Sequence, residues 1–259
     1  MSLGHHWYPV LGGPAPTTNW SFISASSSHG SQTSGAATTT GTVKPNVGDL
    51  MLLAWTGWRG TNYTGATPTD TGSGGWTIIQ SFQTITGGGF QQAACWYKVA
   101  TSADFNSGSG ITVTVTGTGG GGSNFLNMVE CDIFRLLGGH TSPVLDISGF
   151  FNSNGSSPVT QGITASSGST HSAFTDALCW VYAQINSVLP CPAGTQTFTG
   201  TSPATNLTYT GISPDATKIL NQYAGLCQSS STAGSNVAQV SWTTNASKDI
   251  SFFANFVYT

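Results

Sequence analysis

The residues with the clearest chemical potential are two carboxylic acids separated by one position. Glu130 and Asp132 flank Cys131 in a mainly apolar run, and Glu130 is the single glutamate of the chain. Successive side chains of a β-strand point to opposite faces, so residues 130 and 132 of a strand project from the same face. Two carboxyl groups on one face, one protonated and the other ionised, are the machinery of glycoside hydrolysis. This pair is the first candidate for chemistry.

The third position of the pattern argues against catalysis. Laminarinase-like glucanases, which are jelly-roll proteins, use an E-x-D-x-x-E motif, and the chain resembles it only at the first two acidic positions. Arg135 stands at the third position, and an arginine cannot return a proton to a substrate. We therefore expect Arg135 to pair with Glu130 or Asp132. No nucleophile elbow or phosphate-binding loop offers another chemistry, so we expect no catalytic residues and no enzymatic activity.

The best candidate for ligand binding is the glycine- and threonine-rich segment 57–75. Its aromatic side chains can stack on a sugar ring, and its charged and amide groups can form hydrogen bonds. The predicted ligand-binding residues are Trp58, Arg59, Asn62, Tyr63 and Asp70. In the alternative interpretation, the aromatic residues of this segment pack on the chain's own sheets or on a neighbouring subunit. We assign Lys98 and Asp104 to the fold rather than to a site.

The composition excludes several classes of function. Charged residues make up 6% of the 259 residues, against about 25% in an ordinary soluble domain, and the six basic residues are scattered. Nucleic-acid binding needs clustered basic residues, so we expect no nucleic-acid partner. No apolar stretch approaches the ~20 residues of a membrane span, and the first residues lack a secretory signal pattern. We expect synthesis in a cytoplasm and no insertion into a membrane.

Cysteine spacing predicts thiols rather than a metal site or a disulfide framework. The five cysteines are Cys95, Cys131, Cys179, Cys191 and Cys227, and they form no C-x-x-C pair. Three of them lie in apolar strand-like runs, as buried free thiols do. The histidines are equally dispersed, so close-spaced metal ligands are absent. We expect neither a metal nor a cofactor.

Short apolar runs rich in Val, Ile, Thr and aromatic residues recur between clusters of Gly, Ser, Asn and Pro, which predicts β-strands joined by turns. The expected strands are 20–26, 49–57, 76–83, 90–100, 111–116, 125–136, 144–151, 177–186, 218–228, 237–243 and 250–258. Single helical turns are expected at Ser102–Phe105 and Pro214–Thr217. The sequence thus predicts an all-β fold: a two-sheet antiparallel β-sandwich, jelly-roll-like, with about eleven strands and almost no helix.

We expect a single β-sandwich domain over residues 21–259, preceded by an N-terminal extension over residues 1–20. The extension carries Trp7, Tyr8 and Trp20, and exposed aromatic residues on such a segment often dock onto a neighbouring subunit. The alternative is that these side chains fold back onto the core of their own domain.

The order of several segments resembles a known family. The segments are "KPNVGDLMLLAW", "GGWTII", "QAACWYKVATSADFNSGSGITVTVTG", "FLNMVECDIFRL", "PVLDISG", "DALCWVYAQIN" and "AQVSWTTNASKDISFFANFVY". This order resembles a β-sandwich domain of bacteriophage tail, fibre and head-spike proteins, from Lys44 to Tyr258. Each segment also has a plain structural role. Gly48 turns the chain into a strand, Trp76 and Tyr97 fill the core, and Thr101 or Ser102 caps a short turn.

The resemblance implies a virion structural protein on the particle surface, present as a symmetric homo-oligomer and released with the particle. It implies other virion proteins as partners, and a surface of hydroxyl and amide groups suits contact with host-surface polysaccharide. Two alternatives stay open. One is a stand-alone bacterial carbohydrate-binding module or lectin, and the other is a glucanase-like glycoside hydrolase with a degenerate motif at Glu130.

Overall fold

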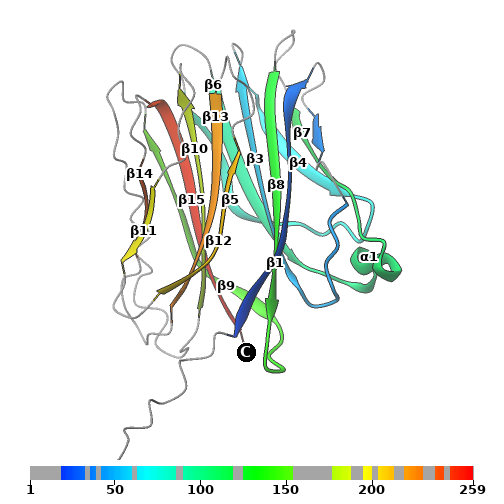
Figure 1. Cartoon of the computed structure of the whole chain (residues 1–259). Coiled ribbons are helices and arrows are strands. Elements are labelled where there is room, and N and C mark those ends of the chain that lie inside the picture. Colours follow the sequence, from blue (N-terminus) through cyan, green and yellow to red (C-terminus); the bar gives the residue numbers. More distant parts are fainter. Residues whose placement is uncertain are drawn as a thin grey trace, which may run out of the picture.

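The computed structural model describes residues 19–32, 36–38, 42–59, 63–85, 90–118, 125–153, 177–187, 195–199, 204–212, 219–229, 237–241 and 246–258. Most of these residues form strands (Figure 1). The strands are β1 (Trp20–Gln32), β2 (Ala36–Thr38), β3 (Leu50–Arg59), β4 (Gly65–Asp70), β5 (Thr77–Ile85), β6 (Phe90–Val99), β7 (Val113–Thr118), β8 (Phe125–Leu136), β9 (Pro143–Ser153), β10 (Ala177–Ser187), β11 (Thr195–Thr199), β12 (Ala204–Ile212), β13 (Ile219–Ser229), β14 (Val237–Ser241) and β15 (Ala246–Tyr258). The fold is therefore all-β, as predicted.

The helical turn expected at Ser102–Phe105 is confirmed as α1, and the 3-10 turn η1 (Asn106–Gly108) follows it. The turn expected at Pro214–Thr217 lies outside the described residues. Each of the eleven expected strands has an observed counterpart, but β2, β4, β11 and β12 were not expected. All four are edge strands of their sheets. Edge strands tolerate residues such as Pro68 of β4 and lack the apolar pattern of central strands, which explains why the sequence does not reveal them.

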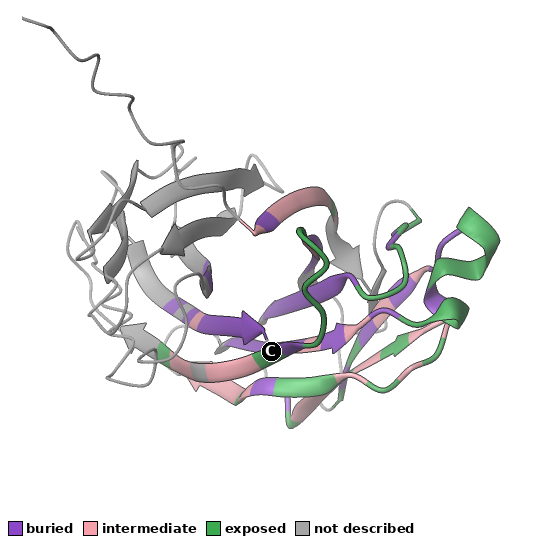
Figure 2. Ribbon diagram, turned by 90° about the horizontal axis from the view of Figure 1, so that it is seen from below, coloured by how far each residue is buried: buried purple, intermediate pink, exposed green. Residues whose placement is uncertain are grey.

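Two five-stranded antiparallel sheets form the main body. The first has the order β1-β8-β3-β6-β5 and the second the order β12-β13-β10-β15-β9. One core lies between them, because its buried members come from both sheets. They include Leu50, Leu52, Ala54, Cys95, Phe134, Trp180, Tyr182, Phe252 and Phe256. In the end-on view of Figure 2, stretches of buried residues run along the described strands of the layers.

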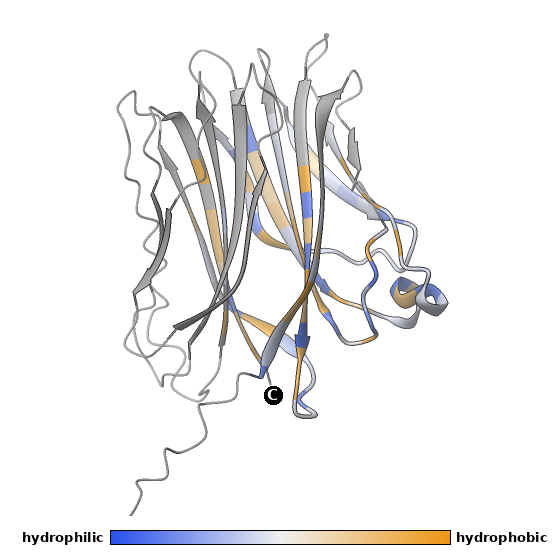
Figure 3. Cartoon of the chain, in the orientation of Figure 1, coloured by the Kyte–Doolittle hydropathy of each residue, from blue (hydrophilic) through white to orange (hydrophobic). Residues whose placement is uncertain are grey.

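A third layer covers the opposite face of the first sheet, which the two-sheet prediction does not include. It is a small sheet with the order β2-β7-β4. Its core with the first sheet includes Met51, Leu53, Trp55, Ile111, Val113, Val115, Val129, Cys131 and Ile133. The predicted alternation at 111–116 is confirmed, since Ile111, Val113 and Val115 are buried and Thr116 is exposed. Along β8, hydrophobic and hydrophilic residues also alternate (Figure 3).

Tyr63 is enclosed in this second core by two glycines. Its ring packs edge-on against the Trp55 ring, with centroids 5.5 Å apart. The side chain of Gln92 holds the backbone of Tyr63 through two hydrogen bonds of 2.8 Å, one to its N–H and one to its carbonyl. A Cβ atom on Gly117 would lie 2.6 Å from the Tyr63 ring, and one on Gly57 would lie 3.1 Å from it. The absence of side chains at both positions makes room for the ring.

The substitution Gly117→Ala should therefore destabilise the protein by about 1–3 kcal/mol, because the added methyl group overpacks a fixed ring. Urea denaturation followed by circular dichroism measures the change. Gly65→Ala is the matched control, since its added carbon would meet only the Thr118 hydroxyl, at 3.2 Å. Equal losses for both variants would contradict the enclosure of Tyr63 by glycine.

Candidate functional site

The two acidic residues of the E-x-D pattern lie on β8 and face the interior between the two large sheets. Val129, Cys131 and Ile133 alternate with them and belong to the core under the small sheet. Glu130 is 1% exposed and Asp132 is 0% exposed. The prediction that both carboxyl groups share one face is consistent with this alternation, but that face is enclosed by the second sheet.

Two hydrogen bonds cross the core beside these carboxyl groups. The Trp180 indole Nε1 donates to Oδ2 of Asp132 at 2.9 Å, and the hydroxyl groups of Thr56 and Tyr182 are 2.5 Å apart. Trp180 and Tyr182 lie on β10, and their rings stack with centroids 5.9 Å apart. The strand register pairs Glu130 of β8 with Ala54 of β3. Asp132 is two residues from Glu130 along β8, and Thr56 is two residues from Ala54 along β3 in the other direction, so all three side chains leave the same face of the sheet. No other described side chain or backbone group binds the Glu130 carboxyl, whose hydrogen-bonding neighbour is the carboxyl group of Asp132.

Burial makes the ionised form of both acids unfavourable. Desolvation raises the pKa of Glu130 well above its ordinary value, and the nearby Asp132 raises it further. Desolvation also raises the pKa of Asp132 to about 6, although the hydrogen bond from Trp180 lowers it in part. The pair therefore retains a proton at neutral pH, with Glu130 as its protonated member. It has the charge state of an acid–base pair but not the access that a substrate needs.

Arg135 does not pair with this acidic pair, and the expectation that it does is wrong. Its Nε and Nη2 atoms bind Oδ1 and Oδ2 of Asp49 at 2.7 and 2.8 Å. The residue number 135 differs from 130 and from 132 by an odd number, so the side chain of Arg135 leaves the other face of β8. Because this alternation can be read from the residue numbers, the sequence alone is enough to place Arg135 on the face opposite to Glu130 and Asp132.

A second group of charges is buried around Lys98 of β6. Its Nζ atom lies 2.5 Å from Oδ2 of Asp70 and 2.6 Å from Oδ1 of Asp104, and 4.8 Å from the centre of the Trp76 ring. The Trp76 indole donates to Asp70 at 2.8 Å, and Ser73 donates to Asp104 through both its N–H and its hydroxyl. We call these five residues the Lys98 cluster.

Hydrogen bonds favour the ionised form of both aspartates in the Lys98 cluster. Desolvation raises the pKa of Asp70, but the bonds from Lys98 and from the backbone of Gly72 and Gly74 outweigh it, and the net shift is downward. The pKa of Asp104 is lowered far more by the equivalent bonds from Lys98, Thr101 and Ser73. The Thr101 N–H and hydroxyl bind Asp104 at the start of α1, as the predicted cap requires. The assignment of Lys98 and Asp104 to the fold fits this arrangement.

The structure does not bring the predicted ligand-binding residues together on one surface. Tyr63 is 1% exposed in the core, and Asp70 belongs to the Lys98 cluster. Segment 57–75 is not one loop, since β4 occupies residues 65–70. Trp58 and Arg59 lie at the end of β3, but their side chains, like the whole of Asn62, fall outside the described part.

Of the three aromatic residues proposed for subunit docking, one is buried and the other two lie outside the described residues. Trp20 is 1% exposed and its ring packs at 6.2 Å against the ring of Tyr258, so it folds back onto its own core. Trp7 and Tyr8 lie outside the described residues. Docking by these two residues stays a prediction.

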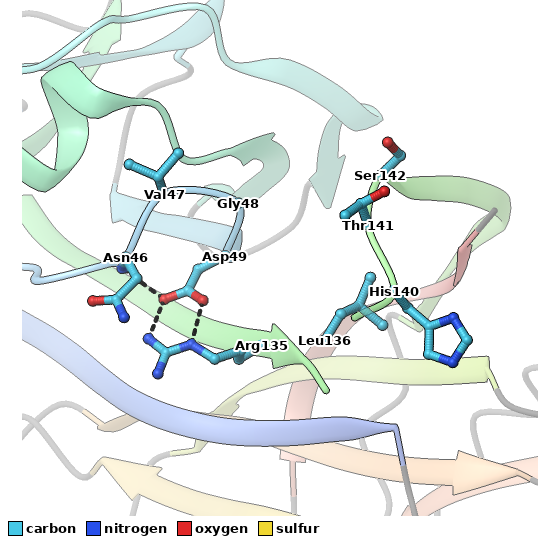
Figure 4. A pocket seen from close by; sticks show the side chains of 9 residues that line it. All are labelled: Asn46, Val47, Gly48, Asp49, Arg135, Leu136, His140, Thr141 and Ser142. Atoms are coloured by element: carbon cyan, nitrogen blue, oxygen red, sulfur yellow. Dashed lines mark hydrogen bonds and ion pairs between the residues drawn. The ribbon is translucent and has the colours of Figure 1, made fainter. Parts of the chain in front are cut away.

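One end of the molecule carries a pocket of about 270 Å³ that the sequence did not indicate. It is lined by the turn before β3, the end of β8 and the connection to β9, with the residues Asn46, Val47, Gly48, Asp49, Arg135, Leu136, His140, Thr141 and Ser142. In Figure 4 the Asp49–Arg135 ion pair lies across the pocket from His140 and Thr141. The predicted turn at Gly48 is confirmed, with φ of +90°.

The groups in this pocket suit an uncharged polar ligand. Asp49 is fixed by Arg135 and by the Asn46 N–H at 2.7 Å, so the charges of the ion pair offset each other. Arg135 is partly exposed and keeps guanidinium protons that Asp49 does not use, and the hydroxyl groups of Thr141 and Ser142 can donate or accept. Sugar hydroxyl groups are ligands of this class.

No three His, Cys, Asp or Glu side chains among the described residues are close enough to hold a metal ion. No helix in the described ranges has the length and apolar character needed to cross a membrane.

The Glu130–Asp132 pair should make the protein less stable as the pH rises. Both pKa values are higher in the folded protein than in an unfolded chain, so the folded state binds more protons between about pH 4 and the folded pKa values. Unfolding free energy should fall from pH 5 to pH 8. Glu130→Gln should flatten this slope and be more stable than the natural protein at pH 8, by on the order of 1–2 kcal/mol.

Urea denaturation at pH 5, 6.5 and 8 measures this dependence, in a range where Asp70 and Asp104 stay ionised. Asp146→Asn, at a half-buried carboxyl outside the pair, is the control and should keep the slope. A Glu130→Gln variant with the full slope of the natural protein would refute the assignment.

Removal of the positive charge of Lys98 should destabilise the protein, whereas Glu130→Gln should stabilise it at pH 8. Lys98→Met leaves two buried carboxylates without a counter-ion and should cost about 3–5 kcal/mol at pH 7. Lys44→Met removes an exposed lysine and should change stability by less than about 0.5 kcal/mol. Guanidinium denaturation of both variants compares them, and a small loss for Lys98→Met would show that the cluster is not required.

Comparisons with known proteins complete the description of the site. No family model, no curated protein and no solved structure matches this chain.

Proposed function

We propose that this chain is a non-enzymatic structural protein of a bacteriophage virion, displayed on the particle surface in symmetry-related copies. The observation that carries the non-catalytic part is the position of Glu130 and Asp132. These carboxyl groups are at most 1% exposed and face the second sheet. A polysaccharide cannot reach them without separation of the two sheets.

The composition of the surface supports display on a particle. The chain has a formal net charge of −3 over 259 residues, and six of its ionisable side chains are buried: Asp49, Asp70, Lys98, Asp104, Glu130 and Asp132. Such a surface has a weak long-range electrostatic field and attracts little charged material. The segment order that resembles phage tail, fibre and head-spike domains points to the same role.

Subunit contacts have candidate positions on the described surface. Large apolar side chains are exposed there at Val47, Ile78, Leu137, Val144 and Phe150. Val47 lines the end pocket and Leu137 follows β8 next to it. Exposed apolar side chains of this size favour contact with other subunits when they gather on one surface.

We assign contact with host-surface polysaccharide to the end pocket rather than to segment 57–75. The pocket combines an internally neutralised ion pair with hydroxyl and amide groups, which suits sugars without ionic groups. The same observation favours the second candidate, a stand-alone bacterial carbohydrate-binding module or lectin. The two functions differ in assembly, because a virion component forms a fixed symmetric oligomer.

Size-exclusion chromatography with light scattering of the full chain should therefore give one species whose mass is two or more whole multiples of 26.7 kDa. Antibodies against the chain should label phage particles in electron micrographs of lysates from cells that carry the gene. A stable monomer together with unlabelled particles would overturn the virion role. Retained binding to neutral glycans by that monomer would select the lectin.

The remaining alternative, a glucanase-like hydrolase, depends on Glu130 alone. Glucan turnover by the natural protein should stay at background, and Glu130→Gln should not change it. Reducing-sugar release that disappears in Glu130→Gln but persists in Asp146→Asn would instead establish hydrolysis.

A further inference from the structure

Two cysteines that are far apart in the sequence are direct neighbours in the second sheet. The antiparallel register of β10 and β13 pairs Cys179 with Cys227, and the pairing is continuous from Ala177 to Ser187. Directly opposed residues of two antiparallel strands lie on the same face of the sheet. Because Leu178, Trp180 and Tyr182 face the core between the large sheets, positions 179 and 227 belong to the outer face.

The backbone spacing at this position is suitable for a covalent bond. Opposed residues of an antiparallel pair have Cα atoms about 4.5 or 5.5 Å apart, depending on whether the pair is hydrogen-bonded. Disulfides join residues whose Cα atoms are roughly 4.4–6.8 Å apart. Both kinds of antiparallel pair therefore fall inside this range of Cα separations.

We propose that Cys179 and Cys227 form a cross-strand disulfide when the protein leaves the reducing cytoplasm. The oxidant is a disulfide such as oxidised glutathione. The Cys179 thiolate attacks one glutathione sulfur and releases one glutathione thiolate. The Cys227 thiolate then attacks the Cys179 sulfur and releases the second glutathione. Two thiols lose two electrons and two protons, and one glutathione disulfide becomes two glutathione thiols.

The other described cysteines have no comparable partner. Cys95 faces the core between the large sheets, whereas Cys131 faces the core under the small sheet, so the first sheet separates them. Both are buried free thiols, as expected from the sequence, and burial raises the pKa of each. Protonated, enclosed thiols are poor nucleophiles. Cys191 lies outside the described residues.

The bond would connect strands in the middle of the second sheet. β10 is the central strand of that sheet, and β13 lies between β10 and β12. On the other side of position 179, the register of β15 pairs Asn255 with it. A disulfide at this position limits the freedom of the unfolded chain between positions 179 and 227. The inference does not depend on the proposed virion role.

Intact-mass spectrometry with N-ethylmaleimide counts the free thiols. The full chain is unfolded, reduced and refolded in a mixture of reduced and oxidised glutathione, then denatured and alkylated. A parallel sample is folded before it meets the same mixture. We expect three adducts without a reductant and all five after reduction. Peptide mapping should place the missing two at Cys179 and Cys227. The oxidised protein should melt about 5–10 °C above the reduced protein.

Single substitutions distinguish this pair from any other. Cys179→Ser and Cys227→Ser should each give four adducts with and without reductant, and should lose the difference in melting temperature. Cys191→Ser is the control and should keep both the bond and the difference. Five adducts without reductant in both folding protocols would overturn the proposal, as would a disulfide that maps to another pair of cysteines.

Discussion

Burial of the first large sheet on both faces is the constraint on which the rest of the structure depends. Residues Leu50 to Thr56 of β3 are all 0% exposed, because the second sheet covers one face and the small sheet covers the other. A charge on such a sheet must be paired or neutralised. In the Lys98 cluster, ion pairs and hydrogen bonds balance the charges of the lysine and the two aspartates. In the Glu130–Asp132 pair, a bound proton removes part of the negative charge.

The same constraint decides where recognition can occur. The groups with the most unusual protonation lie inside the layers, where they affect stability and not substrates. A group of polar side chains that a ligand can reach lies at the end of the layers, where the Asp49–Arg135 pair and the β8–β9 connection meet. In an all-β scaffold of this kind, the ends of the strands carry the contacts and the faces carry the packing.

Central strands could be predicted from the sequence because their apolar patterns are strong, and β8 was predicted with its observed ends. The third layer could not, since β2 and β4 are short edge strands whose pattern is weak. The expected pairing of Arg135 with Glu130 or Asp132 is wrong because residues that are close in the sequence can leave opposite faces of a strand. The end pocket and the Cys179–Cys227 pairing depend on contacts between distant segments, and these become visible only once the register is known. The roles proposed for Trp58, Arg59 and Asn62 fall outside what the structure describes.

The distribution of the layers along the chain has a consequence for synthesis. All strands of the first and small sheets lie before residue 137, and the buried members of the core between them lie within residues 43–133. The second sheet begins at Pro143. A ribosome therefore releases a nearly complete two-layer unit before the second sheet exists. During that interval Leu52, Phe134 and Glu130 lack the cover that the second sheet later gives them, so the face of the first unit that will become the main core is open to water.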